Sequence, residues 1–187
     1  MQSLLNRISA SIQLDDPLKE ALAKHFVPLH LPKGTELLSP EAYANHLHFI
    51  EQGIMHNYYY HDGRQVTSWF YAEEQFVTSW ASFYAQQPSY EGIICLEDCE
   101  VLRISHQAFN QLAQDHSGFG QFARSLAEEM LVVIDMFSKG WSFSSAREKY
   151  QMLNQYFPEI EQRVNLGMIA SFLGISQETL SRIRRPG

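Results

Sequence analysis

Residues 165–185 read N-L-G-M-I-A-S-F-L-G-I-S-Q-E-T-L-S-R-I-R-R, and the interpretation of the whole chain starts from this stretch. Its apolar residues form two sets with helical spacing: Leu166, Ile169 and Leu173, then Ile175, Leu180 and Ile183. Between the sets lies Gly174, which can adopt the left-handed conformation that ends a helix without a Cβ penalty. Ser176 is a good N-cap for a second helix, and Glu178 suits the first turn of that helix. The stretch predicts two short amphipathic helices joined by a tight turn, a helix-turn-helix.

The second predicted helix carries polar side chains on one face near its N-terminal end. In helix-turn-helix motifs this end enters the major groove of DNA and meets the base edges. An ordinary surface pair of helices is the alternative, but spacing, turn residue, cap and polar face together favour DNA binding. The final two arginines are well placed for phosphates. The predicted DNA-binding residues are Ser176, Gln177, Glu178, Thr179, Ser181, Arg182, Arg184 and Arg185.

The charge of the chain has to be reconciled with a polyanionic partner, because the formal net charge is −7. From residue 139 onward there are seven Lys or Arg against four Asp or Glu, which gives +3 and leaves −10 on the residues before it. A basic C-terminal module on an acidic body is compatible with a regulator that carries a small DNA-reading part.

The 187 residues are enough for one large domain or two small ones. Cys95 and Cys99 are too few for a disulfide framework, and the first 14 residues lack the apolar core of a secretory signal. No run reaches the length of a membrane span. We therefore predict a cytoplasmic protein with no membrane partner.

Short strands broken by turns are expected between residues 27 and 104, after a helix over 14–26. Asp62-Gly63 between two apolar runs is a strong hairpin signal. A second strand pair, 93–96 with 101–104, is expected to turn at Glu97-Asp98, and Ser105 is expected to cap a helix. The predicted fold class is α+β, and several strands at this spacing suggest a barrel, roll or sandwich as its first part.

A long helix is expected over residues 119–137. Its apolar residues are spaced by four and three in alternation, as in a coiled-coil seam. A helix packed only on its own sheet is the alternative, but the apolar stripe is wide enough to be shared with a second subunit. Lys139-Gly140 is predicted to be a hinge, followed by a helix over 144–156. The predicted interface residues of a homodimer are Phe119, Ala123, Leu126, Met130, Val133 and Phe137.

This order of elements resembles the catabolite-activator/FNR (CRP/FNR) family of bacterial transcription regulators. The motifs that carry the resemblance are Phe49-Ile50-Glu51-Gln52-Gly53, Cys95-Leu96-Glu97-Asp98 and the run from Ile175 to Arg182. The resemblance implies an effector-sensing, cyclic-nucleotide-binding-like β-roll (1–115), a dimerisation helix (116–138) and a helix-turn-helix DNA-binding domain (139–187). It also implies a palindromic operator and RNA polymerase as partners, and no enzyme activity.

The sensor half departs from that family. Nucleotide-binding members carry a Gly-Glu pair and an Arg-Ser pair, and this chain has Thr78-Ser79 and Ser89-Tyr90 instead. Without the arginine a buried phosphate would lack its counter-charge, so cyclic AMP is not expected. Two cysteines are too few for an FNR-type cluster, and no cofactor is predicted. The residues Ser79, Ser82, Ser89 and Tyr90 are predicted either to bind an uncharged polar effector or to close an empty pocket.

A cupin-type metal enzyme, or another ligand-binding β-roll protein, is the alternative function. His46 and His48 would share one face of a strand and could hold a metal. Glu51 would point to the opposite face, and no later histidine completes a second motif. We therefore predict no metal site.

Overall fold

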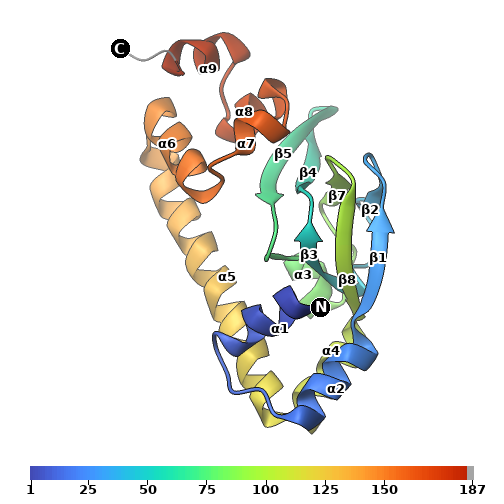
Figure 1. Ribbon diagram of the computed structural model, residues 1–187. Helices are drawn as coiled ribbons and strands as arrows, with labels where there is room; N and C mark the ends of the chain where they lie inside the picture. Colours follow the sequence, from blue (N-terminus) through green and yellow to red (C-terminus); the bar gives the residue numbers. More distant parts are fainter. Residues whose placement is uncertain (185–187) are drawn as a thin grey trace.

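A computed structural model describes residues 1–184, apart from the side chains of residues 139, 140 and 142. Its centre is a roll of eight strands (Figure 1), namely β1 (Val27–Leu31), β2 (Glu36–Leu38), β3 (His46–Gln52), β4 (Met55–His61), β5 (Arg64–Tyr71), β6 (Phe76–Val77), β7 (Gly92–Cys95) and β8 (Cys99–Ser105). They form two four-stranded sheets with the orders β1-β8-β3-β6 and β2-β7-β4-β5. Every pairing is antiparallel. The predicted β-roll is confirmed.

The hairpin predicted at Asp62-Gly63 is confirmed and joins β4 to β5. Both turn residues have left-handed backbones, with φ of +50° at Asp62 and +71° at Gly63. A turn with two positive φ angles matches the twist of the strands that it connects.

The predicted pairing of the strands around 93–96 and 101–104 is wrong. β7 pairs with β2 and β4, whereas β8 pairs with β1 and β3. The turn at Glu97-Asp98 therefore carries the chain from one sheet to the other. A short turn between two apolar strands is common to both arrangements, so the sequence pattern could not separate them.

Helices cover one end of the roll: α1 (Gln2–Ser9), α2 (Asp16–His25) and α4 (His106–Asp115). Ser105 caps α4 as predicted, since its Oγ accepts a hydrogen bond from the Ala108 amide at 3.1 Å. α1 was not expected, yet Leu4 and Ile8 on it are fully buried in the core beneath the roll. A further short helix, α3 (Trp80–Ala85), interrupts the segment for which the sequence suggested only a pocket wall.

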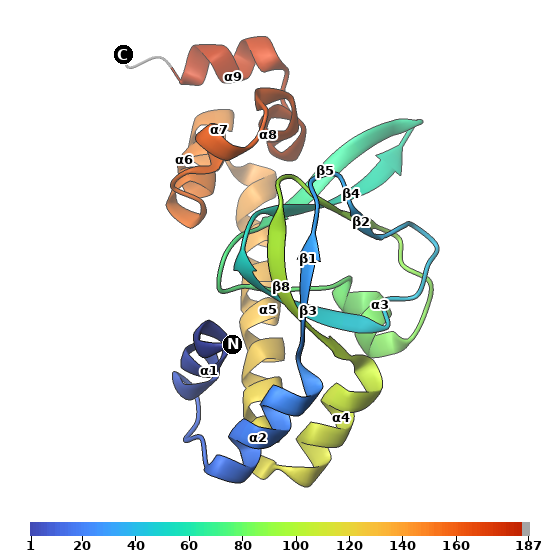
Figure 2. The ribbon, with the colours of Figure 1, turned by 45° about the vertical axis from the view of Figure 1, so that its right-hand side comes forward.

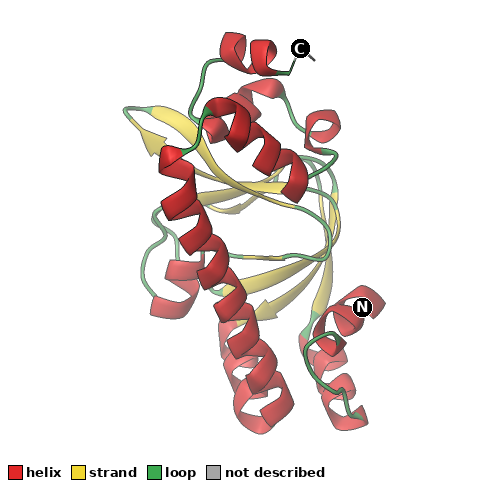
Figure 3. Cartoon of the chain, turned by 90° about the vertical axis from the view of Figure 1, so that its left-hand side faces the viewer, coloured by secondary structure: helices red, strands yellow, loops and turns green. Residues whose placement is uncertain are grey.

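The longest helix, α5 (Ser117–Phe143), runs along both sheets (Figure 3). The hinge predicted at residues 139–140 is wrong, because α5 continues through them. A glycine inside a helix destabilises it by only about 1 kcal/mol, which the aromatic packing of Phe137 and Trp141 outweighs. The chain turns at residues 144–145 instead, where Ser145 and Glu148 form a capping box at the start of α6 (Ala146–Tyr156).

The last helices are α7 (Ile160–Arg163), α8 (Leu166–Leu173) and α9 (Gln177–Ile183). We call residues 146–184 the head. It lies on the end of the roll opposite to α2 and α4 (Figure 2). Ile54, Phe70 and Leu96 of the roll share one apolar core with the head, so the two parts are packed together. Within the described chain no helix is both long and apolar enough to cross a membrane.

Candidate DNA-binding head and effector cavity

The turn between α8 and α9 has the geometry that the sequence predicts. Gly174 ends α8 with a left-handed backbone, φ +67°. The Ile175 amide donates to Ala170 O at 3.0 Å, which closes the turn over a buried, small residue. Ser176 Oγ accepts a hydrogen bond from the Thr179 amide at 3.2 Å and caps α9. The cap and the turn together fix the N-terminal end of α9.

The polar face of α9 is open to solvent, at the far end of the molecule from α2 (Figure 2). Leu180 on its opposite face is fully buried in the head. Arg182 Nη2 donates to Thr179 Oγ1 at 3.0 Å, which holds its side chain along the helix. The exposed predicted residues are Ser176, Gln177, Glu178, Ser181 and Arg182, with Thr179 half-buried.

Arg184 is engaged inside the head. Its guanidinium donates to both carboxylate oxygens of Glu161, with N···O distances of 2.8–3.1 Å. The structure therefore does not present this arginine as the free phosphate ligand that the sequence suggested. Arg185 lies outside the described residues.

The head is tied to the roll by an ion-pair cluster around Arg163. Its guanidinium donates to the two oxygens of Glu73 at 2.7 and 2.8 Å and also pairs with Glu97. Burial alone would raise the pKa of Glu73, but hydrogen bonds from Arg163 and from the Gly53 amide outweigh it and lower that pKa to about 2. Both carboxylates sit on turns of the roll, so one head residue links two of its loops.

An aromatic cluster forms the second contact between roll and head. Trp69 on β5 packs edge-on against Phe137 of α5, with ring centroids 4.5 Å apart. The same indole lies 5.9 Å from Phe172 and 6.1 Å from Phe157 of the head. Trp69 therefore contacts the roll, the long helix and the head at once.

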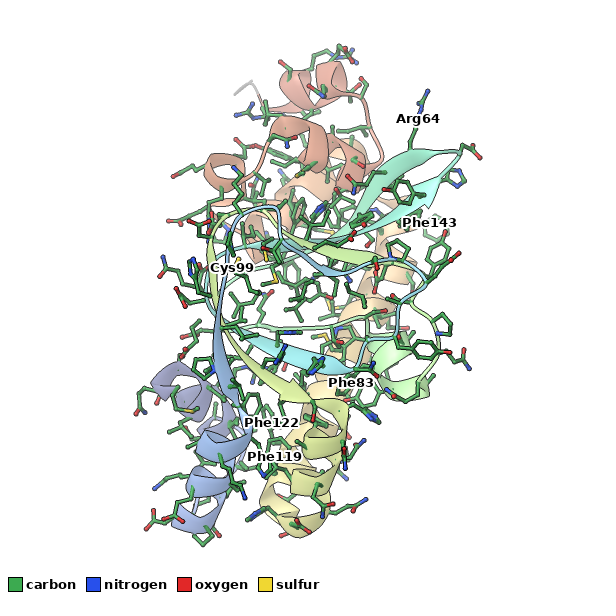
Figure 4. All side chains as sticks on the ribbon, turned by 90° about the vertical axis from the view of Figure 1, so that its right-hand side faces the viewer. Arg64, Phe83, Cys99, Phe119, Phe122 and Phe143 are labelled. Carbon is green, nitrogen blue, oxygen red and sulfur yellow. The ribbon has the colours of Figure 1, made fainter. Side chains whose placement is uncertain are left out.

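The residues predicted for the dimer seam face their own chain. Phe119 and Leu126 are buried in the core under the roll (Figure 4 labels Phe119), and Ala123 packs against that core. Met130 and Val133 line a cavity, and Phe137 contacts the head. The prediction that Phe119 and Leu126 contact a second subunit is therefore wrong, because these side chains fill the core next to α1 and α4. The large exposed apolar side chains of α5, among the described residues, are Leu131, Val132, Ile134, Met136 and Phe143.

A cavity of about 470 Å³ lies between the roll and α5. β4, β5 and α3 contribute one wall, and the middle of α5 contributes the other. Aromatic side chains dominate the lining: Trp69, Tyr71, Phe76, Trp80, Phe137 and Tyr156. Trp69 and Tyr71 are two residues apart on β5, and alternation places both on the inner face.

The polar part of the cavity wall is acidic. Glu91 lines it, and Ser68 Oγ lies 3.4 Å from Glu91 Oε2. Burial raises the pKa of Glu91, and hydrogen bonds from Asn57, Ser79 and Ser68 only partly oppose this. Asn57 is 2% exposed, and its Oδ1 has no hydrogen-bond partner among the described residues.

The histidines that suggested a metal site do not form one. Among the described residues no group of three His, Cys, Asp or Glu side chains could hold an ion. The His46 and His48 rings are 6.1 Å apart, and burial lowers the pKa of His48 to about 3. Glu51 pairs with the N-terminal amine of Met1 instead.

Comparison with known proteins gives the same architecture. Residues 28–116 match the cyclic nucleotide-binding domain. The global regulator CLP of Xanthomonas campestris, described as c-di-GMP responsive, has a TM-score of 0.66 at 17% identity, over 90% of this chain and 89% of that one. FixK2 from Bradyrhizobium japonicum gives 0.69 at 14% identity, over 84% and 82%. The catabolite activator protein of Thermus thermophilus gives 0.59 at 18% identity, over 91% and 82%. No curated protein sequence matches the chain.

The chain therefore shares its fold with these regulators.

The residues predicted to bind an effector do not line the cavity. Ser82 Oγ accepts from the Ala44 amide at 2.9 Å and donates to Gln87 O. Ser89 Oγ donates to Glu91 O at 2.7 Å. Ser79 is buried and bonds to Glu91, and Tyr90 is 73% exposed. The serines hold the backbone around α3 in place, and none of the four predicted residues is among those that line the cavity.

The sequence alone does not identify the residues that line this cavity as a site. One residue in the sequence could have indicated the site: Asn57 is an amide within an otherwise apolar and aromatic strand. β4 and β5 have a bulge beside it, with Asn57 opposite Trp69. Without the three-dimensional pairing, nothing in the sequence places Asn57 beside Glu91, which lies 34 residues further along the chain.

Proposed function

We propose that this chain is a dimeric transcription regulator that reads DNA with α9 and senses a small molecule in the cavity beside α5. The observation that carries the proposal is the exposed polar face of α9, held by the Gly174 turn and the Ser176 cap. The shared fold with known transcription regulators supports it. Double-stranded DNA with a palindromic operator and RNA polymerase are the expected partners.

Base reading falls to Gln177, Glu178 and Arg182 in this proposal. An arginine suits the O6/N7 edge of guanine, and a glutamate can accept from cytosine N4. Contacts to the DNA backbone or to base edges are also expected from Ser176, Thr179 and Ser181, which lie on the same helix or at its cap. Because Glu161 compensates the charge of Arg184, phosphate contacts from this arginine are expected to be weaker than those of an unpaired one.

A dimer would supply the affinity that one small head lacks. Paired recognition helices about 34 Å apart match successive major grooves on one face of DNA. The exposed apolar side chains on α5 offer the subunit contact, since large apolar residues grouped on a surface mark interaction sites.

The cavity does not suit a cyclic nucleotide. Glu74, Glu91 and Glu129 line it, and the one arginine in its wall, Arg7, already pairs with Glu129. A phosphate there would meet carboxylates and no free guanidinium among the lining residues, which is unfavourable in a partly desolvated site.

The test is selection of bound DNA from a random pool by the full-length protein. A palindromic consensus is expected, because two heads related by symmetry read two half-sites. Arg182→Ala should relax the preference at one base pair of each half-site and weaken binding by about 1–3 kcal/mol. Arg124→Ala is the matched control, since Arg124 is an exposed arginine on α5 far from the head.

No enrichment from the pool would contradict DNA reading. An Arg182→Ala protein with unchanged sequence preference would contradict the assignment of α9 as the reading helix.

A further inference from the structure

The wall of the cavity beside α5 includes two hydrogen-bond acceptors, the Asn57 amide oxygen and the Glu91 carboxylate. Asn57 Oδ1 is a buried acceptor with no hydrogen-bond partner among the described residues. Glu91 is a half-buried carboxylate whose side-chain partners in the described chain are neutral, namely Asn57, Ser68 and Ser79. A buried acceptor left unsatisfied is unfavourable by about 1–3 kcal/mol, so a ligand with N–H donors would relieve it.

The rest of the wall suits a cation. Trp69, Tyr71 and Trp80 present aromatic rings around the same space, and an ammonium over the face of such a ring is attracted to it. The indole Nε1 of Trp80 is also buried with no partner in the described chain, so an acceptor elsewhere on a ligand could be accommodated.

Acidic side chains outnumber basic ones at the cavity rim. Glu74 and Glu129 line it together with Glu91, and Arg7 is the one lining cation among the described side chains. Arg7 Nη2 is held by Glu129 Oε2, so its charge is compensated. The summed charge of these four side chains is −2 with Glu91 ionised, and a cation would be concentrated in the cavity.

We propose that the effector of this regulator is a small organic amine, bound as an ammonium whose N–H groups donate to Glu91 and Asn57 Oδ1 while its apolar part packs between Trp69 and Trp80. The inference deepens the sensing half of the proposed function and rests on it for the biological use of the ligand. The cavity of about 470 Å³ has room for an amine with an aromatic or branched aliphatic group.

Three probes of similar size and different headgroup test the proposal: phenethylamine, 2-phenylethanol and 3-phenylpropanoate. Affinities are measured by calorimetry at pH 8 on the full chain, with quenching of tryptophan fluorescence as a second readout. Phenethylamine should bind at least tenfold more tightly than the alcohol, and the carboxylate should bind most weakly. Cyclic AMP is the fourth probe and should bind more weakly than phenethylamine.

Two variants locate the preference. Glu91→Gln keeps the shape of the side chain and should remove the tenfold preference of amine over alcohol, while binding of the alcohol is retained. Asn57→Leu should reduce amine affinity several-fold without reversing the order of the probes. Glu20→Gln, an exposed glutamate on α2, is the matched control and should leave every affinity unchanged.

Equal affinity for the amine and the alcohol, a tighter 3-phenylpropanoate or cyclic AMP, or an unaltered preference in Glu91→Gln would each overturn the proposal. None of these measurements contains DNA. A protein that selects no DNA but prefers the amine would therefore refute the proposed function and leave the cavity assignment standing. A protein that selects DNA but does not prefer the amine would refute the cavity assignment and leave the proposed function standing.

Discussion

Gly53 shows how strongly one residue can be constrained at the end of a strand. Its φ is +112°, and a Cβ added there would lie 2.5 Å from Cys99 Sγ and 2.9 Å from Asp98 O. A side chain would meet both a strained backbone and atoms of the β7–β8 turn, which cannot retreat without disturbing that crossing between the sheets.

Gly53→Ala should lower the free energy of unfolding by about 2 kcal/mol or more, because backbone strain and a steric clash add. Urea denaturation measures it. Gly34→Ala is the control, since Gly34 has φ of +82° but no atom within 4 Å of the added Cβ. In the control the free energy of unfolding should fall only by the contribution of backbone strain, about 1 kcal/mol. Equal losses would mean that the crossing does not confine Gly53.

Two buried histidines make the stability of the fold depend on pH. Burial lowers the pKa of His48 to about 3 and that of His56 to about 4. The unfolded chain binds these protons near pH 6.5 and the folded chain does not. The stability conferred by the neutral rings is therefore complete above about pH 6.5 and is lost as the pH falls toward 4.

The free energy of unfolding should fall by up to about 1.4 kcal/mol per pH unit for each of these histidines over that range. Urea curves at pH 7, 5.5 and 4.5 measure the slope. His56→Gln should lower this slope by up to about 1.4 kcal/mol per pH unit, the contribution of one proton. His30→Gln changes an exposed histidine and should leave the slope unaltered. An unchanged slope in His56→Gln would show that other groups carry the acid sensitivity.

At the scale of elements, α5 has one buried face and one exposed face. Its N-terminal half fills the core under the roll, and Phe137 and Trp141 near its C-terminal end pack on one another and on the ring of Phe172. Between these parts Leu131 is 66% exposed and Val132 57% exposed. The contact with a second subunit is therefore expected along this middle stretch.

Leu131→Glu should weaken the dimer at least tenfold, because burying one large apolar side chain contributes about 1.5–3 kcal/mol. Sedimentation equilibrium on the full chain measures it. Gln121→Glu adds the same charge to an exposed site on the same helix and should leave the dimer intact. If wild type and Leu131→Glu have the same mass in solution, the stretch is not the interface.

Local signals in the sequence were sufficient for several elements. Asp62-Gly63, Ser105, Gly174 and Ser176 act through their own backbone or first-turn hydrogen bonds, so their structures could be predicted one element at a time. The seam on α5 could not, because its spacing fits a partner helix and its own roll equally well. The cavity could not be predicted either, because Asn57 and Glu91 are brought together only by the pairing of β4 with β7.

At the scale of the molecule, Arg163 controls how firmly the head sits on the roll. Arg163→Met would leave Glu73 and Glu97 close together without a counter-charge. The free energy of unfolding should fall by about 1–3 kcal/mol, a range reduced for partial exposure of the three side chains.

The triple variant Arg163→Met, Glu73→Gln, Glu97→Gln should recover most of that loss, because it removes the repulsion along with the attraction. Urea denaturation and limited proteolysis at residues 144–145 together report stability and detachment of the head. A single variant as stable and as protease-resistant as wild type would show that the aromatic cluster alone holds the head.

The core that Ile54, Phe70 and Leu96 share with the head has a consequence for engineering. If the sensor were exchanged for another at the end of the long helix, the apolar residues of the head that pack on the roll would lose these contacts. A working chimera has to keep Ile54, Phe70 and Leu96 together with the head, or redesign both sides of that contact at once.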